Sequence, residues 1–344
     1  MSTTEQTASA HDQTEPDARS MQAVVQDRYG SAEVLRHATV ARPATGENDV
    51  LIEVRAAGLH IGDWHLMTGQ PYLMRIMGFG LRAPKARVRG TDVAGTVVAV
   101  SAHVTGVQVG DEVFGTCDGS YAEYATARPD TLAPKPANLS FVQAAAVPTS
   151  AATALAAVRD AGHVTAGQQV LVIGASGGVG LFAVQIAKAL GAEVTGVCST
   201  TKVALVRSAG ADHVIDYNQK DINTNARRYD VIIDMGGNRP LSQLRRSLSP
   251  RGTLVLVGGE GGGRWIGGAM GRSLRALMLS PFVKQKLRMV LATAKRPALQ
   301  ALTELIDAGQ VTPIIDTTYP LSDAPDAVRR LCTGQAHGKL AIQI

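Results

Sequence analysis

The stretch Val170-Leu-Val-Ile-Gly-Ala-Ser-Gly-Gly-Val-Gly180 is the most informative in the chain, because an apolar run passes through a glycine turn directly into a helical pattern. Glycines let backbone N–H groups approach a pyrophosphate, and the following helix presents its positive N-terminus to the same group. Ala175 stands where the strict motif has its first glycine, so the motif letters alone are weak. The context favours dinucleotide binding: a strand before the loop, a helix after it, and a second strand at the expected distance.

Strands and helices continue to alternate around this loop. Between residues 147 and 286, short apolar runs alternate with helical segments, which is typical of parallel βαβ units covered on both faces. We expect a doubly wound α/β domain there, with about five or six strands. Residues 21–146 carry short β-branched runs separated by Gly, Asn or Asp, which predicts a β-rich, rolled domain interrupted by a helix and loop over 63–89. Residues 287–344 are expected to fold back onto that domain.

The tip of the second strand indicates which dinucleotide binds. Enzymes that use NAD place Asp or Glu there, to accept hydrogen bonds from the ribose hydroxyls. This strand instead ends at Ser199 and Lys202, and Glu193 lies at its opposite end. A hydroxyl and an ammonium would donate to a 2′-phosphate, which a carboxylate would repel. The sequence therefore predicts NADP(H) as the cofactor.

Composition excludes several classes of function. The 344 residues carry a formal net charge of +5 and 4% aromatic residues, without a nucleic-acid-binding module. Cys117, Cys198 and Cys332 form no paired framework, which predicts a cytoplasmic protein. No apolar run is long enough for a transmembrane helix. Residues 1–20 have no secretory signal and are expected to form a disordered tail.

The chain from residue 21 onward resembles the medium-chain dehydrogenase/reductase superfamily, in particular its zinc-free quinone oxidoreductase branch. Besides the glycine loop, the matching stretches are 57–63, 90–95, 109–115, 121–124, 144–149, 210–217 and 338–339. The resemblance implies that the β-rich domain is GroES-like and built from both chain ends around an inserted Rossmann domain. It also implies a homodimer.

The resemblance further implies roles for individual residues in holding the cofactor. The pyrophosphate would contact Ser176, Gly177, Gly178 and Val179. The 2′-phosphate would be held by Ser199, Lys202 and Tyr217. The nicotinamide half would lie near Thr149, Val257 and Gly258.

The zinc sites of related alcohol dehydrogenases are not expected here. Zinc-containing relatives place a cysteine where His60 stands, a histidine–glutamate pair where Thr91 and Asp92 stand, and four clustered cysteines in a lobe. Histidine and aspartate alone cannot supply three ligands and an open position. The sequence therefore argues against zinc alcohol dehydrogenase chemistry.

Without a metal, hydride must pass to an acceptor whose own conjugation spreads the developing charge. Quinones meet this requirement, and we expect a small-molecule acceptor of this kind. Candidate residues near the reacting groups are His60, as a hydrogen-bond donor, Asp63, as an orienting or N-capping residue, and Tyr72. Two alternatives stay open: reduction of the double bond of α,β-unsaturated carbonyls, and a low-turnover NADPH-binding redox sensor.

One basic and apolar segment could touch a membrane. Residues 261–303 contain eight Lys or Arg and no acid, interleaved with large apolar residues such as Trp265 and Met270. Glycines and Pro281 break the pattern. We therefore favour a cover over the substrate cleft or a dimer contact for this segment.

Overall fold

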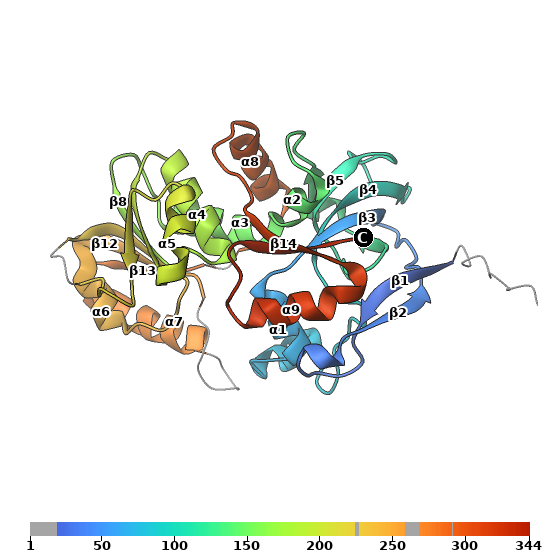
Figure 1. Ribbon diagram of the computed structural model, residues 1–344, viewed down its shortest axis with the longest axis horizontal. Helices are drawn as coiled ribbons and strands as arrows, with labels where there is room; N and C mark the ends of the chain where they lie inside the picture. The colour runs from blue at the N-terminus through green and yellow to red at the C-terminus, as the bar shows by residue number, and fades with distance from the viewer. Residues whose placement is uncertain (1–18, 224–226, 259–267, 291) are drawn as a thin grey trace, which may run out of the picture.

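The computed structural model describes residues 19–223, 227–258, 268–290 and 292–344, and of residues 268–270 it describes the backbone alone. The expected tail over 1–20 lies almost wholly outside these ranges, as does Trp265, and nothing is described of the Met270 side chain. The described chain forms two lobes, with the middle of the chain in one lobe and both ends in the other (Figure 1). Helices long and apolar enough to span a bilayer do not occur in the described ranges.

The middle of the chain forms a six-stranded sheet in which every pairing is parallel. Its strand order is β10 (His213–Asp216), β9 (Glu193–Cys198), β8 (Gln169–Ile173), β11 (Tyr229–Asp234), β12 (Leu248–Leu256), β13 (Lys286–Met289). The order reverses between β8 and β11, so this is the predicted doubly wound sheet with a switch point for a ligand. The sheet continues to the end of β13, so the domain boundary expected at 286–287 falls inside that strand.

The β-rich lobe contains a second sheet made from both chain ends. Its order is β14 (Ile315–Pro320), β15 (Lys339–Gln343), β3 (Val50–Gly58), β4 (Asp92–Val100), β5 (Glu112–Thr116), β7 (Leu132–Pro134), with β6 (Tyr124–Ala127) also on β3. The antiparallel pairing of β15 with β3 joins the two ends, as the sequence predicts. A separate antiparallel pair consists of β1 (Ser20–Val25) and β2 (Arg36–Ala41).

Helices cover both lobes. The longer ones are α1 (Ile61–Thr68), α3 (Pro148–Leu155), α4 (Gly178–Ala189), α7 (Gly268–Leu279), α8 (Arg296–Asp307) and α9 (Ala324–Cys332). Shorter helices are α2 (Phe141–Ala145), α5 (Val203–Ser208), α6 (Leu241–Ser247), η2 (Arg75–Phe79) and η4 (Ala156–Ala161). Single turns are η1 (Ala32–Val34), η3 (Pro129–Thr131), η5 (Thr200–Lys202), η6 (Ser280–Phe282) and η7 (Leu321–Asp323). In the segment 63–89, expected as helix and loop, the helical parts are the C-terminal part of α1 and η2.

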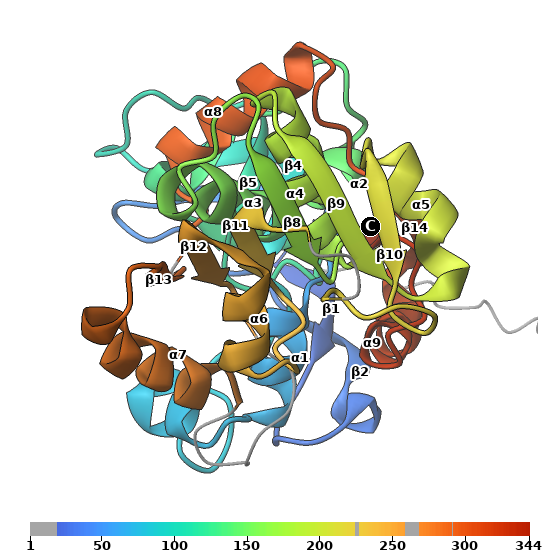
Figure 2. The ribbon, with the colours of Figure 1, turned by 90° about the vertical axis from the view of Figure 1, so that its left-hand side faces the viewer.

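Figure 2 shows α4 behind the strands of the parallel sheet and α6 in front of them.

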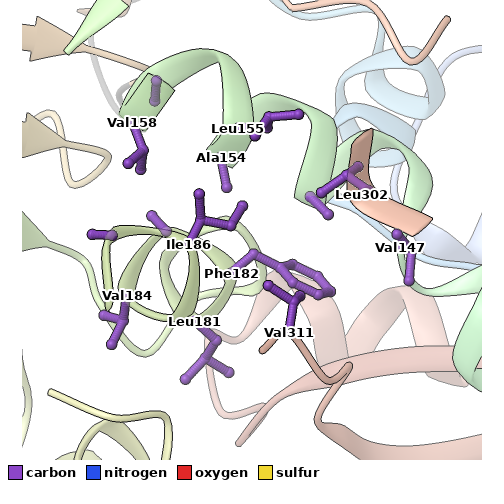
Figure 3. Packing of buried hydrophobic residues seen from close by; sticks show 14 of the residues in the cluster. Val147, Ala154, Leu155, Val158, Leu181, Phe182, Val184, Ile186, Leu302 and Val311 are labelled. Atoms are coloured by element: carbon purple, nitrogen blue, oxygen red, sulfur yellow. The ribbon is translucent and has the colours of Figure 1, made fainter. Parts of the chain in front are cut away.

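One hydrophobic core runs through both lobes and fixes their relative position. Phe182, on α4, is 2% exposed and packs in the same cluster as Leu302 and Val311 from the returning C-terminal segment (Figure 3). Ala56 and Phe114, from the β-rich sheet, belong to this cluster as well. Truncating a buried Phe typically costs about 3–5 kcal/mol. The seam between the lobes is therefore a packed interface that can position polar groups.

Candidate cofactor and substrate site

The glycine loop joins β8 to α4 in the way a pyrophosphate site requires. Gly174 has a φ of +79°, a conformation that glycine adopts without strain. A Cβ on Gly180 would lie 2.1 Å from the carbonyl oxygen of Gly174, so only glycine lets the helix approach the strand this closely. Gly177 is the N-cap of α4, and the first N–H groups of the helix, starting at Gly178, point to the loop. The residues from Ser176 to Val179 thus form a helix N-terminus with the geometry that an anion site requires.

The expected 2′-phosphate residues lie together at the carboxyl edge of the same sheet. β9 ends beside β10, because Cys198 pairs with Asp216, so Ser199 and Tyr217 follow neighbouring strand ends. Tyr217 is 53% exposed. Lys202 lies in the adjoining turn and donates to the carbonyl oxygen of Gly334 at 2.8 Å. An ammonium has three N–H donors, so this contact leaves two for a phosphate.

A buried lysine connects the glycine loop to the β-rich lobe. Lys339, at the start of β15, is 3% exposed. Its ammonium donates to the carbonyl oxygen of Leu59 at 2.5 Å and to the hydroxyl of Ser150 at 2.8 Å. A Cβ on Gly178 would lie 3.8 Å from the Lys339 Nζ. A cation is therefore held at the seam, next to the loop that would carry a pyrophosphate.

Next to Leu59, His60 stands at the start of α1 within a cluster of polar side chains. The His60 Nε2 lies 2.7 Å from the Thr91 hydroxyl, 3.7 Å from Asp92 Oδ1 and 3.8 Å from Asp63 Oδ2. Asp63 accepts the backbone N–H of His60 at 2.9 Å, which is an N-terminal capping contact. Asp92 is fully buried and accepts hydrogen bonds from both the backbone N–H and the hydroxyl of Thr149. The structure therefore brings His60, Asp63 and Thr149 together.

Burial and opposite charges set the electrostatics of this cluster. Burial raises the pKa of Asp92, although His60 and Lys339 oppose the rise. Burial lowers the pKa of the Lys339 ammonium, against the attraction of Asp92 and Asp63. Burial also raises the pKa of Tyr121 well above its ordinary value, and the Asp63 carboxylate adds to the rise. Each of the two buried carboxylates therefore lies near a positively charged side chain: Arg89 for Asp63, and Lys339 for Asp92. This attraction offsets part of the cost of burying the two acids.

Neither Tyr72 nor the end of β12 takes part in the contacts that join His60, Asp63, Thr91, Asp92 and Thr149. The Tyr72 ring instead packs on Arg75, whose guanidinium carbon is 4.6 Å from the ring centroid. Val257 follows β12 at the carboxyl edge of the parallel sheet, and its N–H donates to the carbonyl oxygen of Asp234 at 3.1 Å. Gly258 is the next residue and the last one described before the gap. These two positions are at the edge where the nicotinamide half was expected.

The possible metal donors around His60 are its own imidazole and the carboxylates of Asp63 and Asp92. Zinc needs three protein ligands at about 2.0–2.2 Å with one open position. The His60 Nε2 already contacts the Thr91 hydroxyl, and the Asp92 carboxylate is occupied by Thr149. Throughout the described ranges, no group of three or more His, Cys, Asp or Glu side chains is arranged to hold a metal ion.

Family models match two parts of the chain. Residues 46–137 match the alcohol dehydrogenase GroES-like domain, and residues 209–342 match a family described as zinc-binding dehydrogenase. The chain is 30% identical to the chloroplast envelope quinone oxidoreductase homolog of Arabidopsis thaliana, across 94% of this chain and 98% of that protein. It is 32% identical to the mouse protein NAD(P)H oxidoreductase RTN4IP1, mitochondrial, across 94% of this chain and 89% of that protein. The quinone oxidoreductase from Coxiella burnetii superposes with a TM-score of 0.83 at 28% identity, covering 94% of this chain and 99% of that one.

The chain belongs to the medium-chain dehydrogenase/reductase superfamily, in its quinone oxidoreductase branch. The predicted resemblance is thereby confirmed, as is the combination of a GroES-like domain with a parallel-sheet domain. Membership makes this protein an oxidoreductase by family.

The structure places Lys339, Asp92 and Thr91 in this medium-chain dehydrogenase/reductase site, although the sequence predicts no site role for them. Lys339 lies in the matching stretch 338–339, and Asp92 lies in the matching stretch 90–95. Buried charged side chains are rare unless they are paired, so a lysine or aspartate within an apolar strand pattern is the signal that could have found them.

Proposed function

We propose that this protein is an NADPH-dependent oxidoreductase that transfers hydride to a quinone or a similar conjugated carbonyl acceptor without zinc. The observation that carries the proposal is the buried Lys339, whose ammonium links Leu59, beside His60, to Ser150, beside the glycine loop. A pyrophosphate on that loop would bring one end of the cofactor to the cation. The other end would lie at the seam, within reach of the His60 cluster.

The residues of the chain would have distinct tasks. Residues 176–179 and Lys339 would bind the pyrophosphate, while Ser199, Lys202 and Tyr217 would hold the 2′-phosphate. When bound, the reduced nicotinamide supplies the hydride. His60 and the Thr91 hydroxyl, 2.7 Å apart, would donate a hydrogen bond to the acceptor oxygen. Asp92 holds the backbone and hydroxyl of Thr149 in place, which fixes the start of α3 at the seam.

The proposal is tested by following NADPH absorbance in the presence of a small quinone and, separately, of an enone. We expect oxidation that prefers NADPH to NADH and is unchanged by a chelator. Faster turnover with the enone would assign the protein to double-bond reduction of α,β-unsaturated carbonyls. Tight NADPH binding with no oxidation by either acceptor would replace the reductase with a redox sensor. Loss of activity on chelation would refute the zinc-free proposal.

We also propose that the protein acts as a cytoplasmic homodimer. The buried cysteines Cys117 and Cys198 form no disulfide, which fits a reducing compartment. β13 is the last strand of the parallel sheet, and the exposed apolar side chains near it include Phe282 at 84% and Met289 at 53%. Pairing across this edge would cover both. Equilibrium sedimentation should give twice the chain mass, and a monomer would refute the assembly.

A further inference from the structure

We propose that the segment from Ile76 to Arg87, beside α1, docks on an anionic lipid surface. This segment comprises most of η2 and the loop after it, and it is called the loop below. Four of the exposed large apolar side chains in the described ranges fall within six positions of this loop: Ile76 at 67%, Met77 at 68%, Phe79 at 46% and Leu81 at 69%. Apolar residues so closely spaced on a soluble surface mark an interaction site. In both views the loop lies with α1 at the lower edge of the molecule, on the side of α7 (Figures 1 and 2).

The loop is held in a shape that displays these side chains. The Tyr29 hydroxyl donates to the carbonyl oxygens of Phe79 and Gly80, at 3.0 and 2.7 Å. Arg75 stacks on the rings of Tyr29 and Tyr72, with its guanidinium carbon 4.2 and 4.6 Å from the two centroids. The anchors are backbone carbonyls and the cation of Arg75, so the apolar side chains are left outward instead of filling the core.

The charge of the loop identifies the partner. Residues 70–89 contain five Lys or Arg and no Asp or Glu. Arg82 and Lys85 are exposed, and among the described residues neither forms an ion pair. Arg87 pairs with Asp27 at 2.7 Å, but Asp27 is shared with Arg36. Exposed apolar tips flanked by uncompensated cations fit the boundary between acyl chains and anionic headgroups.

A second copy of the chain fits this loop less well. A two-fold contact through the loop would place Arg82 and Lys85 of both copies in one interface, where like charges repel. The apolar residues around β13, by contrast, lie on a sheet edge and include no part of this loop. The two exposed apolar surfaces can therefore serve different partners.

Docking would also bring α1 and His60 close to the membrane, so that a lipid-soluble acceptor could enter from the bilayer. This consequence rests on the proposed reductase function, whereas the docking itself does not. Vesicle binding is measured without acceptor or turnover, so the two proposals can fail separately.

The test is co-sedimentation of the full chain with phosphatidylcholine vesicles, with and without about 30% phosphatidylserine as the anionic lipid. We expect binding to the anionic vesicles and little binding to phosphatidylcholine alone. The triple variant Ile76→Ser, Met77→Ser, Leu81→Ser should lower the partition coefficient at least about ten-fold. The double variant Arg82→Ser, Lys85→Ser should lower it about five-fold for each cation removed.

The matched control is the double variant Leu277→Ser, Met278→Ser, which removes two apolar side chains, 70% and 74% exposed, from α7. It should sediment like the unmodified chain. Unchanged melting and NADPH binding would show that the loop variants are folded. The proposal is overturned if the unmodified chain stays in the supernatant with anionic vesicles, or if the loop variants bind as well as it does. The proposal is also overturned if the α7 control loses as much vesicle binding as the loop variants do. A third refuting result would be loop variants that change their oligomeric mass but keep their vesicle binding.

Discussion

Replacing Lys339 by Met would separate a cofactor contact from a purely structural one. The Lys339 ammonium uses two of its three N–H donors, on the Leu59 carbonyl and the Ser150 hydroxyl, and one is left for a phosphate oxygen. A hydrogen bond to a charged group contributes about 1.5–3 kcal/mol. We therefore expect the Kd of NADPH to rise about 10- to 150-fold in Lys339→Met.

The free energy of unfolding without cofactor should change much less. Losing a partner costs about 1–3 kcal/mol for each of the two acceptors. Removing a buried ammonium relieves a desolvation penalty that is itself several kcal/mol. Because these effects oppose each other, we expect a net change within about 2 kcal/mol. Lys295→Met, which removes an exposed lysine paired with Asp130 at 3.0 Å, is the matched control and should leave both quantities nearly unchanged.

The assay is isothermal titration of NADPH into each variant, alongside urea unfolding of the same samples. Burial lowers the pKa of Lys339, so the unmodified protein should lose NADPH affinity as pH rises through a value below the 10.5 of an ordinary lysine. This pH-dependent loss should be absent in Lys339→Met. An unchanged Kd together with a large loss of stability would refute the cofactor role and leave Lys339 as a structural link.

Three other predictions concern the parallel-sheet domain. Lys202→Ala should lower the ratio of kcat/KM for NADPH to kcat/KM for NADH about ten-fold or more, because a charged contact to the 2′-phosphate is lost. An unchanged ratio would show that Lys202 does not contact the 2′-phosphate. In urea unfolding, Gly180→Ala should lower the free energy of unfolding by about 1–3 kcal/mol, because its Cβ would lie 2.1 Å from the Gly174 carbonyl oxygen. The control is Gly177→Ala, whose Cβ would lie 3.4 Å from the same oxygen and which should cost under about 1 kcal/mol. Hydrogen bonds from Gln169, His213 and Arg227 lower the pKa of Glu193 from 4.5 to about 2, so its stabilising contribution is present above pH 4.5 and lost as pH falls toward 2. The melting temperatures of the unmodified protein and Glu193→Gln should therefore differ above pH 4.5 and converge near pH 2, and a constant difference would contradict this.

The parallel sheet could be predicted from the sequence because its signals are local. Each of its central strands is a short apolar run followed by a helical pattern, and residues 170–180 mark the ligand edge. The closeness of Ser199 and Tyr217 also follows, because adjacent parallel strands end at the same edge of a sheet. β13 was the exception. Its four residues, Lys286–Met289, expose three side chains, so the strand lacks the apolar run of a buried strand.

The seam could not be predicted, because its contacts join distant parts of the chain. Lys339 is 280 residues from Leu59 and 189 from Ser150, and Asp92 is 57 residues from Thr149. Local periodicity carries no information on such pairs. The backbone pairing of β15 with β3 is what brings Lys339 to Leu59, and the sequence predicts only that the two chain ends meet.

The charges at the seam explain how a site so deeply buried can stay folded before a ligand arrives. Two carboxylates, on Asp63 and Asp92, face two cations, on Arg89 and Lys339, and each of the four residues is at most 6% exposed. The four charges therefore cancel before any ligand is bound. The Lys339 ammonium still has one N–H donor that neither Leu59 nor Ser150 uses, so a phosphate oxygen beside the glycine loop can bind to it without breaking either contact.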